Sequence, residues 1–401
     1  MPLLGAVSRD RLAQLARLLS IDPRFAGKGL QFDIGAVYPL TGPGSIYGNR
    51  FSDVPKMAFR HIEALGGPHF NLVMKDNKSG DPQSGVDDVR ELGFAKVPMC
   101  LSSYAADLGS MIPGIAQYRM LSIDGSGGTS LFAQHKPYFW GAIAITPNDA
   151  IGGAARYIAA KMPHVRRIAF VGWDLGELSD MVAADMRKRI RSGSYELVAD
   201  ERTAIGETDY GAALEKVKIG NPDLVFMALY AEDVGYFAKQ YATSGIGKPV
   251  FGFSHTDAAA KIAGAAYEGL YFAFDYFDAN RPANPWARFF IDEFKAAEGG
   301  GLPDYYSANT YEDVFIFWEC IRRVLKAGGN PKLGQQLNAA LQARPVFPSL
   351  YGGSASAAGQ IAFNPLTHSL TSRPMSVSQY RNGQVTPLAF FNIGGAGFRL
   401  A

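Results

Sequence analysis

From about residue 32, short apolar runs alternate with longer stretches whose apolar positions recur at helical spacing. The runs "FDIGAVY", "FNLVMKD" and "VPMCL" read as strands, and they are separated by helical patterns over Gly48 to Leu65 and over "PQSGVDDVRELGF". Strands that alternate with helices of this length indicate βαβ units, in which helices cover a parallel sheet. The pattern therefore predicts an α/β fold.

A second series of the same kind follows. Its expected strands are "RRIAFVGWD", "YELVADE", "PDLVFMALY" and "KPVFGFS", and its expected helices are "MVAADMRKRI", "YGAALEKVKI" and "GYFAKQYATSG". A chain of 401 residues is also too long for one ordinary core. We therefore expect two similar lobes, each a doubly wound, Rossmann-like sheet.

The stretch from about 284 to 343 is strongly helical in pattern. In its middle part, apolar residues recur at helical spacing, which predicts a core helix: Val314, Phe317, Trp318, Ile321 and Leu325. The C-terminal segment instead alternates apolar and polar residues and contains "RNGQ", and Asn-Gly between alternating runs predicts a β-hairpin.

The first 31 residues form a separate extension. Arg9, Arg11 and Arg17 lie among leucines, which indicates a short amphipathic helix and not the basic and then apolar regions of a signal peptide. Either a leader was removed upstream or the protein is cytosolic, and the sequence leaves both open. No apolar run approaches the roughly 20 residues of a membrane span.

Composition narrows the class of partner. The formal net charge of +2 and the 19% of charged residues give no broad basic field, so nucleic acid or an anionic membrane is not expected as the main partner. Cys100 and Cys320 show no metal-ligand spacing. We expect both to be unpaired core residues, although a disulfide between them stays open.

The common catalytic and nucleotide motifs are missing. "SGIGKP" is a poor match to a phosphate loop, no GxGxxG opens a helix, and the six histidines do not cluster. "GFSHT" lacks the last glycine of a nucleophile elbow, so Ser254 with His255 is only a weak esterase signal. We expect no cofactor and no catalysis.

Small hydroxyl residues and aromatics follow several of the expected strands. They occur in "TGPGSIYG", "LSSYAAD", "IDGSGGTS", "GWDLGE", "LYAED" and "FSHTD". Because ligands of parallel α/β sheets bind at the carboxyl ends of the strands, these loops predict a ligand site. Hydroxyls and backbone donors would hold the polar end of the ligand, and aromatic rings would surround its body.

Three segments carry a family resemblance. "IGAVYPLTGPGSIYG", "LVMKDNKSGDPQSGVDDVREL" and "PDLVFMALYAEDVGYFAKQYATSGIGKPVFG" resemble the branched-chain amino-acid type of ABC-transporter substrate-binding protein, the type I periplasmic binding proteins. The resemblance runs from about Phe32 to the end. It implies two lobes that close on a ligand about three crossovers near 140–147, 274–282 and 345–352. Lobe 1 would be 32–142 plus 280–346, and lobe 2 would be 147–275 plus 350–401.

The resemblance also implies the site. Ser102 or Ser103 would hold a ligand carboxylate, and Asp124 is a candidate counter-charge. Asp76 would shape a loop. The full set of expected ligand-binding residues is Tyr47, Ser102, Ser103, Tyr104, Asp124, Gly125, Ser126, Gly127, Trp173, Tyr230, Ser254 and His255.

The function implied is capture of a small polar ligand, an amino acid or a related carboxylate or amide, by a monomeric periplasmic protein that serves the permease of an ABC importer. Amino-acid binders often carry a glutamate after the strand that corresponds to "PVFGF", whereas this chain has "SHTD". That difference disfavours a plain aliphatic amino acid and leaves amides, urea and aromatic carboxylates open. The alternatives are a cytosolic ligand-sensing regulator of the same fold and a serine hydrolase that uses Ser254 or His255.

Overall fold

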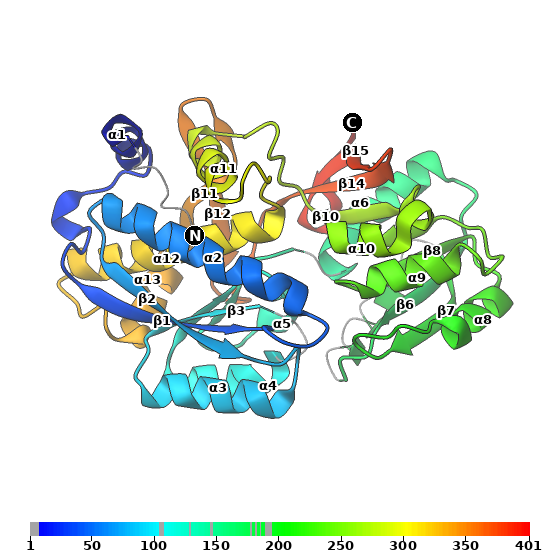
Figure 1. Ribbon diagram of the computed structural model, residues 1–401, viewed down its shortest axis with the longest axis horizontal. Helices are drawn as coiled ribbons and strands as arrows, with labels where there is room; N and C mark the ends of the chain where they lie inside the picture. The colour runs from blue at the N-terminus through cyan, green and yellow to red at the C-terminus, as the bar shows by residue number, and fades with distance from the viewer. Residues whose placement is uncertain are drawn as a thin grey trace. The chain divides into compact units, whose positions relative to one another are not determined.

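The chain forms two compact α/β units, as the alternating pattern predicts. The computed structural model describes residues 8–103, 108–127, 130–144, 147–176, 179–180, 183–184, 186–188 and 195–401. The first unit runs to Ile143 and adds Phe277–Ser372, and the second comprises Ala144–Tyr276 and Arg373–Ala401. The chain therefore passes between the units three times (Figure 1).

The first unit contains a mixed sheet in the order β11-β12-β13-β5-β4-β3-β1-β2. The strands from β13 to β2 run parallel to one another, and β12 pairs antiparallel with both β11 and β13. The bounds are β1 Gln31–Tyr38, β2 His69–Asp76, β3 Met99–Ser102, β4 Leu121–Asp124, β5 Phe139–Gly141, β11 Val346–Ser354, β12 Ala357–Asn364 and β13 Ser369–Leu370.

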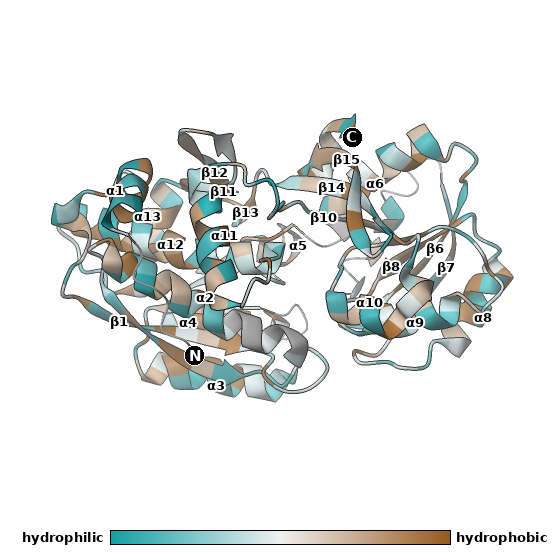
Figure 2. Ribbon diagram, turned by 45° about the horizontal axis from the view of Figure 1, so that its top comes forward, coloured by the Kyte–Doolittle hydropathy of each residue, from teal (hydrophilic) through white to brown (hydrophobic). Residues whose placement is uncertain are grey.

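Helices cover this sheet on both sides. Figure 1 shows α3 and α4 together on one side, with α2 and α12 on the other. Helices such as α3 and α11 carry both hydrophilic and hydrophobic residues, as amphipathic helices do (Figure 2). The bounds are α1 Arg9–Leu18, η1 Pro23–Phe25, α2 Ser45–Ala64, α3 Pro82–Phe94, α4 Leu108–Tyr118, α5 Ser130–Ala133, α11 Pro285–Ala297, α12 Tyr305–Lys326 and α13 Gly334–Ala343.

The second unit contains a sheet in the order β16-β15-β14-β10-β9-β8-β6-β7. Strands β6, β7, β8, β9 and β10 run parallel to one another, and β14, β15 and β16 extend the sheet in antiparallel fashion. The strands are β6 Arg167–Trp173, β7 Glu196–Thr203, β8 Leu224–Ala228, β9 Val250–Gly252, β10 Tyr271–Asp275, β14 Pro374–Arg381, β15 Gln384–Asn392 and β16 Ala396–Leu400. The helices are α6 Pro147–Lys161, α8 Gly211–Gly220, α9 Asp233–Tyr241, α10 Asp257–Ala263, η3 Gly264–Tyr267 and η4 Ile393–Gly395.

The parallel parts of the two sheets share one topology. In each, the first strand lies between the second and the third, and the fourth and fifth follow outward. The strand order reverses between β1 and β3 in the first unit and between β6 and β8 in the second. Ligands of open α/β sheets bind at such switch points, outside the carboxyl ends of the strands.

The third crossover lies further along the chain than the resemblance implies. We expected it near 345–352, but β11, β12 and β13 extend the sheet of the first unit and the chain changes unit after Ser372. Immediately beyond this point, Arg373 Nε lies 3.5 Å from Asp275 Oδ2, with both side chains buried in the second unit. Asp275 lies one residue before the end of the first part of the second unit, and Arg373 begins its second part. The ion pair therefore joins the two segments at which the chain leaves and re-enters this unit.

The C-terminal hairpin is confirmed. Strands β14 and β15 pair antiparallel with Arg381 opposite Gln384, so that Asn382 and Gly383 form a two-residue turn. Both turn residues have positive φ, 51° and 76° respectively, as a type I′ turn requires.

The N-terminal helix is also confirmed, and it packs on the first unit. Ser8 caps α1 by accepting a hydrogen bond from the Arg11 backbone, and the Arg11 guanidinium lies 2.9 Å from Asp292 on α11. Further along, Trp318 Nε1 donates to the carbonyl of Ala26 at 2.8 Å. Residues 8–26 are thus attached to α11 and α12 and do not form a separate body.

Both cysteines are buried and form no disulfide, as expected. Cys100 lies in β3 and Cys320 in α12, and each is fully enclosed. Burial raises the pKa of the Cys320 thiol to about 12, so this side chain behaves as an apolar core residue.

Two adjacent glycines let α6 approach the C-terminal segment closely. A Cβ atom on Gly152 would lie 2.2 Å from the carbonyl oxygen of Gly394, and one on Gly153 would lie 2.5 Å from the ring of Phe391. The neighbour of Gly152 is backbone, which cannot rotate away as a side chain could. This contact therefore depends on glycine at position 152.

We expect Gly152→Ala to destabilise the protein by about 1–3 kcal/mol, because the added methyl group must separate α6 from η4. The measurement is the urea midpoint followed by circular dichroism.

Gly109→Ala in α4 is the matched control. Gly109 is exposed, and a Cβ there would meet nothing within 4 Å. Alanine at this position should leave stability unchanged or raise it by up to about 1 kcal/mol. Equal midpoints for the two variants would contradict the close-approach argument.

Candidate functional site

Two of the predicted residues meet at adjacent strand ends in the first unit. Ser102 ends β3 and Asp124 ends β4, and they are partners in the register of the parallel pair. The Ser102 hydroxyl donates to Asp124 Oδ2 at 2.8 Å, and both side chains are buried. The sequence argument thus placed both residues correctly at the carboxyl edge of the sheet.

Asp124 organises the loop that follows it. Its Oδ1 accepts hydrogen bonds from the backbone N–H of Ser126 at 3.0 Å and of Gly127 at 2.5 Å. This is an Asx-type arrangement, in which an aspartate satisfies the backbone donors two and three residues ahead. The amides of Ser126 and Gly127, which we expected to face a ligand, are therefore hydrogen-bonded within the loop.

Helix α12 packs directly against this loop. A Cβ on Gly125 would lie 2.2 Å from Asp313 Oδ2, and Asn309 Nδ2 donates to the Gly125 carbonyl at 3.3 Å. Asn309 and Asp313 are both buried. Gly125 thus serves close packing of the loop on α12.

The sequence argument missed Asn309 and Asp313. The available signal was their spacing at i and i+4 on a helix that also carries Ser307, Thr310 and Glu312, because a polar residue on a buried helix requires a hydrogen-bonding partner. Nearby, burial raises the pKa of Tyr38, which ends β1, well above its ordinary value, and the charge of Asp313 raises it further.

Ser103 differs from its neighbour Ser102. It is 1% exposed, and its Oγ has no hydrogen-bond partner among the residues that the structure describes. A buried polar group without a partner costs free energy, so a hydroxyl with open hydrogen-bonding capacity at a strand end is a strong candidate for ligand contact.

Two expected ligand-binding residues are not among the described side chains. Tyr104 lies outside the described residues. Tyr47 belongs to α2, but its side chain is likewise outside the described part. Asp76, in contrast, shapes its loop as expected: it accepts from the backbone of Leu40 at 2.9 Å and from the Thr41 hydroxyl at 2.7 Å.

The second unit brings Trp173 and Tyr230 together. Trp173 ends β6 and Tyr230 follows the adjacent β8, so both lie at the switch point of that sheet. Their ring centroids are 5.1 Å apart with the planes tilted by 56°. The two rings thus pack against each other at the carboxyl ends of their strands.

Asp233, at the start of α9, anchors the tryptophan. Its Oδ2 accepts from Trp173 Nε1 at 2.7 Å and from the Gly206 backbone N–H at 2.9 Å. Burial raises the pKa of Asp233 to about 6, although these two hydrogen bonds oppose the rise. Sequence reasoning missed this residue because an aspartate in the first turn of a helix is usually a simple capping group.

Ser254 and His255 have packing environments of their own. Ser254 is completely buried. His255 Nδ1 lies 3.1 Å from the Tyr267 hydroxyl, and its ring contacts those of Tyr267, Phe272 and Tyr380. The structure therefore places His255 in a different aromatic cluster from Trp173 and Tyr230, and it buries the serine that a hydrolase would have to expose.

Comparison with known proteins identifies the family. The sequence profile described as "Periplasmic binding protein" matches residues 31–384. The chain belongs to the periplasmic binding protein family. It is 22% identical over 327 residues to the Leu/Ile/Val-binding protein homolog 1 of Brucella melitensis. The alignment covers 80% of this chain and 84% of that protein.

Solved structures agree on the fold of this family. An R. palustris solute-binding protein in complex with benzoate superposes with a TM-score of 0.76 at 18% identity, over 92% of this chain and 98% of that one. The LivJ substrate-binding protein of Streptococcus pneumoniae, in complex with isoleucine, gives 0.72 at 20% identity, over 88% and 97%. These likenesses show that this chain has the type I periplasmic binding protein fold.

Within the described ranges, every helix falls short of the length or the apolar character that crossing a bilayer demands.

We expect the fluorescence of Trp173 to titrate with a midpoint near pH 6, because protonation of Asp233 weakens the acceptor that its indole N–H contacts. Fluorescence of the ligand-free protein between pH 4 and pH 8 measures this. Trp173→Phe and Asp233→Asn should each remove the transition, and its persistence in Trp173→Phe would assign it to another tryptophan.

The raised pKa of Asp233 also predicts how stability changes with pH. In the unfolded chain Asp233 ionises near the ordinary aspartate pKa of about 3.9, whereas in the fold it ionises near pH 6. Its ionisation therefore reduces the free energy of unfolding as pH rises between these values, and the loss persists above them. Asp233→Asn lacks this loss, so Tm of the variant minus Tm of the parent should increase from pH 4 to pH 7. A constant difference would contradict the raised pKa.

Proposed function

We propose that this protein captures, in the periplasm, a small carboxylic acid with an apolar, preferably aromatic, body. It would then deliver this ligand to the permease of an ABC importer. The observation that carries the proposal is the buried, unpaired hydroxyl of Ser103, given the described residues around it, at the end of β3. A carboxylate is an acceptor that such a hydroxyl can satisfy, and a hydrogen bond to a charged group is stronger than one to a neutral group.

The preference for an aromatic body rests on the second unit. Trp173 and Tyr230 pack together at their strand ends, and aromatic rings favour offset or edge contacts with another ring. Two of the structural relatives support this direction, since their complexes hold benzoate and 4-hydroxybenzoate.

A branched-chain amino acid is the second candidate, because other relatives bind leucine or isoleucine. An amino acid needs a counter-charge for its ammonium group. Asp124 already accepts three hydrogen bonds from its own unit, and Asp233 has a raised pKa and two donors. Neither carboxylate is well prepared to pair with an ammonium ion, which favours the aromatic acid.

The proposal includes closure of the protein on its ligand, as the resemblance implies. A ligand that binds the closed form more tightly than the open form shifts the population toward closure. Small-angle scattering with and without ligand should therefore show a smaller radius of gyration in the complex. An unchanged radius at saturation would contradict closure.

The first test is a thermal-shift panel of benzoate, 4-hydroxybenzoate, leucine, isoleucine and acetamide. A ligand at about 100 times its Kd should stabilise the native state by roughly 2.7 kcal/mol, which is visible as a rise in Tm. Hits for benzoate or 4-hydroxybenzoate without hits for leucine or isoleucine would support the proposal, and hits for the two amino acids alone would favour the second candidate. Acetamide as the single hit would contradict it.

Ser103→Ala tests the carrying observation. Because the hydroxyl has no partner among the described residues in the free protein, its removal should leave Tm unchanged or slightly raised, while the affinity for the best carboxylate falls roughly ten- to a hundredfold. Calorimetric titration measures the affinity.

Ser122→Ala is the matched control. Ser122 is equally buried, and its hydroxyl is also unpaired within the described ranges, but it lies inside β4 and not at the strand end. Its removal should leave the affinity unchanged. Equal losses in both variants would point to a general effect on the sheet and would remove Ser103 from the site.

A further inference from the structure

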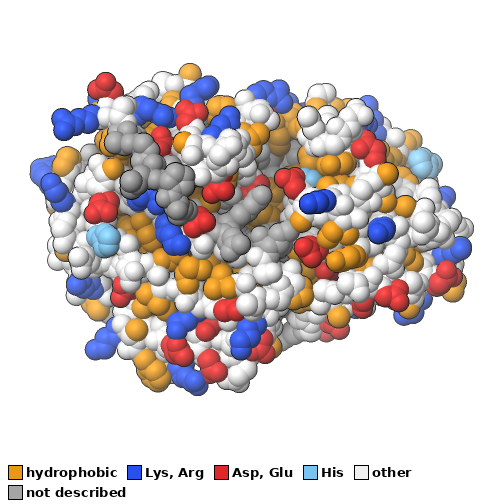
Figure 3. Space-filling model, viewed as in Figure 1, with side chains coloured by type: hydrophobic (Ala, Val, Ile, Leu, Met, Phe, Trp, Pro, Cys, Tyr) orange, Lys and Arg blue, Asp and Glu red, His pale blue; other side chains and the backbone are white. Residues whose placement is uncertain are grey.

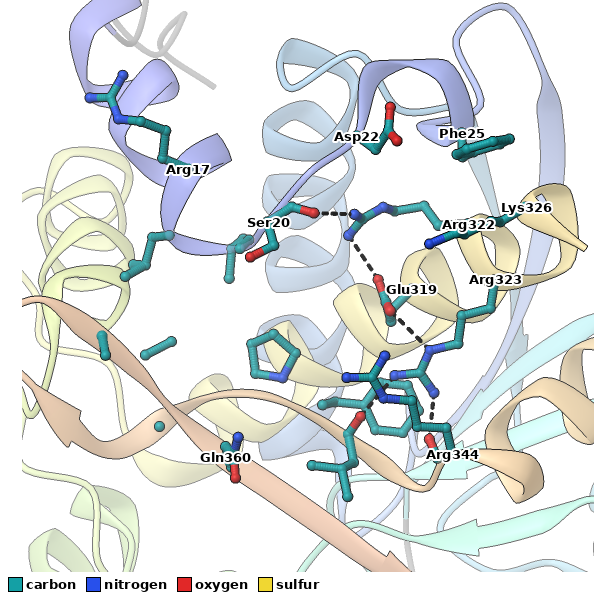
Figure 4. A pocket seen from close by; sticks show the side chains of 18 of the residues that line it. Arg17, Ser20, Asp22, Phe25, Glu319, Arg322, Arg323, Lys326, Arg344 and Gln360 are labelled. Atoms are coloured by element: carbon teal, nitrogen blue, oxygen red, sulfur yellow. Dashed lines mark hydrogen bonds and ion pairs between the residues drawn. The ribbon is translucent and has the colours of Figure 1, made fainter.

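A cavity lies within the first unit, away from the strand-end residues of the candidate site. It has a volume of about 530 Å³ and lies among three segments: residues 17–25, helix α12 and the β11–β12 hairpin (Figure 4). Its basic lining residues are Arg17, Arg322, Arg323, Lys326 and Arg344. We call it the Arg322 pocket.

Two guanidinium groups in the Arg322 pocket share one carboxylate. Glu319 Oε2 accepts from Arg322 Nη1 at 2.7 Å, and Oε1 accepts from Arg323 Nε at 2.9 Å. All three side chains are at most 21% exposed. Glu319 therefore balances only one of these two guanidinium charges, while Arg323 also donates to the carbonyls of Arg344 and Val346. Low exposure makes an incompletely balanced charge costly.

The other acidic lining residue, Asp22, supplies only part of this balance: its charge acts on Arg322 less strongly than that of Glu319 does, and it also acts on Lys326. Asp22 holds its carboxylate against Arg24, with Oδ2 2.7 Å from Arg24 Nη2. This contact keeps the pKa of Asp22 lowered to about 2. Arg24 does not line the pocket, so the charge of Asp22 is shared between Arg24 and the pocket cations.

Arg322 also has an unsatisfied donor. Its Nη2 donates to the Ser20 carbonyl at 2.6 Å, but the buried Nε finds no partner in the part of the chain that the structure describes. Burial lowers the pKa of Arg322, which means that the pocket disfavours the cation as it stands. An anion near this side chain would relieve both conditions.

The charge of this pocket is local. Five cationic side chains face two carboxylates, an excess larger than the formal net charge of +2 for the whole chain. On the face seen in Figure 3, by comparison, basic and acidic side chains are interspersed. At the rim, Arg344 and Lys326 are exposed and can reach a solute without breaking a contact of the core.

We infer that the Arg322 pocket is a second binding site, which takes a small anion with two or more negative charges, such as inorganic phosphate or a tricarboxylate. Its volume lies in the range of small-molecule sites, about 300–1,000 Å³. Arginine matches the planar geometry of carboxylate and phosphate oxygens, and lysine adds a point charge. The inference is independent of the proposed ligand of the strand ends, because it rests on different residues.

The test measures binding of sodium phosphate and of citrate to the full chain by thermal shift and calorimetry. Sodium chloride and sodium acetate at matched ionic strength are the reference. Phosphate or citrate should raise Tm in a saturable manner that chloride and acetate do not reproduce. Arg344→Gln and Lys326→Gln should each weaken this binding roughly tenfold, since each removes one charge at the exposed rim.

Arg156→Gln is the control, because it removes one exposed positive charge from α6 in the second unit. It should leave phosphate and citrate binding unchanged, and neither rim variant should alter the binding of benzoate. Equal shifts with acetate, or equal losses in Arg156→Gln and Arg344→Gln, would show general charge screening and overturn the inference. Binding of an acidic peptide without binding of phosphate or citrate would also overturn it.

Discussion

Parallel pairing on both sides of the first strand is the constraint from which each unit is built. In the first unit β1 pairs with β2 on one side and β3 on the other, and in the second unit β6 pairs in the same way with β7 and β8. Because crossover connections are right-handed, the helices that enter and leave the second strand must cover opposite faces. The carboxyl ends of the two inner strands are then left uncovered, and Ser103 and Trp173 lie there for this reason.

Buried carboxylates shape the loops at these ends. Asp124 accepts from its own loop and from the neighbouring strand in the first unit, and Asp233 accepts from Trp173 and Gly206 in the second. A buried carboxylate is tolerated only when donors surround it, so each one holds several backbone and side-chain groups in one geometry. Side chains that a ligand would meet are thereby preorganised, which reduces the ordering cost of binding.

The sequence predicted the alternating elements, the two units and the C-terminal hairpin, because all of these depend on local periodicity and on the direction of parallel strands. The same reasoning placed Ser102, Asp124, Trp173 and Tyr230 at or just beyond strand ends. It misplaced the third crossover, since an alternating strand such as β12 carries no local mark of which sheet its edges will join. It also missed Asn309 and Asp313, whose roles arise from packing between α12 and a loop 184 residues away in sequence. The direction of the His255 side chain, toward Tyr267, could not be predicted either, because side-chain direction in a loop is set by tertiary neighbours.

The two proposed sites share one feature, a buried hydrogen-bond donor that has no partner among the described residues. A polar group that loses water without gaining a partner lowers stability by about 1–3 kcal/mol, so its position matters more than its presence. Inside a strand, as at Ser122, no solute can reach it and the loss is simply carried. At a strand end, as for Ser103, or beside a cavity of about 530 Å³, as for Arg322, a solute can supply the missing partner. The free energy that the unpaired donor costs the free protein is then recovered when a ligand binds. The neutral hydroxyl of Ser103 would favour a single carboxylate, and the guanidinium of Arg322 would favour a multivalent anion.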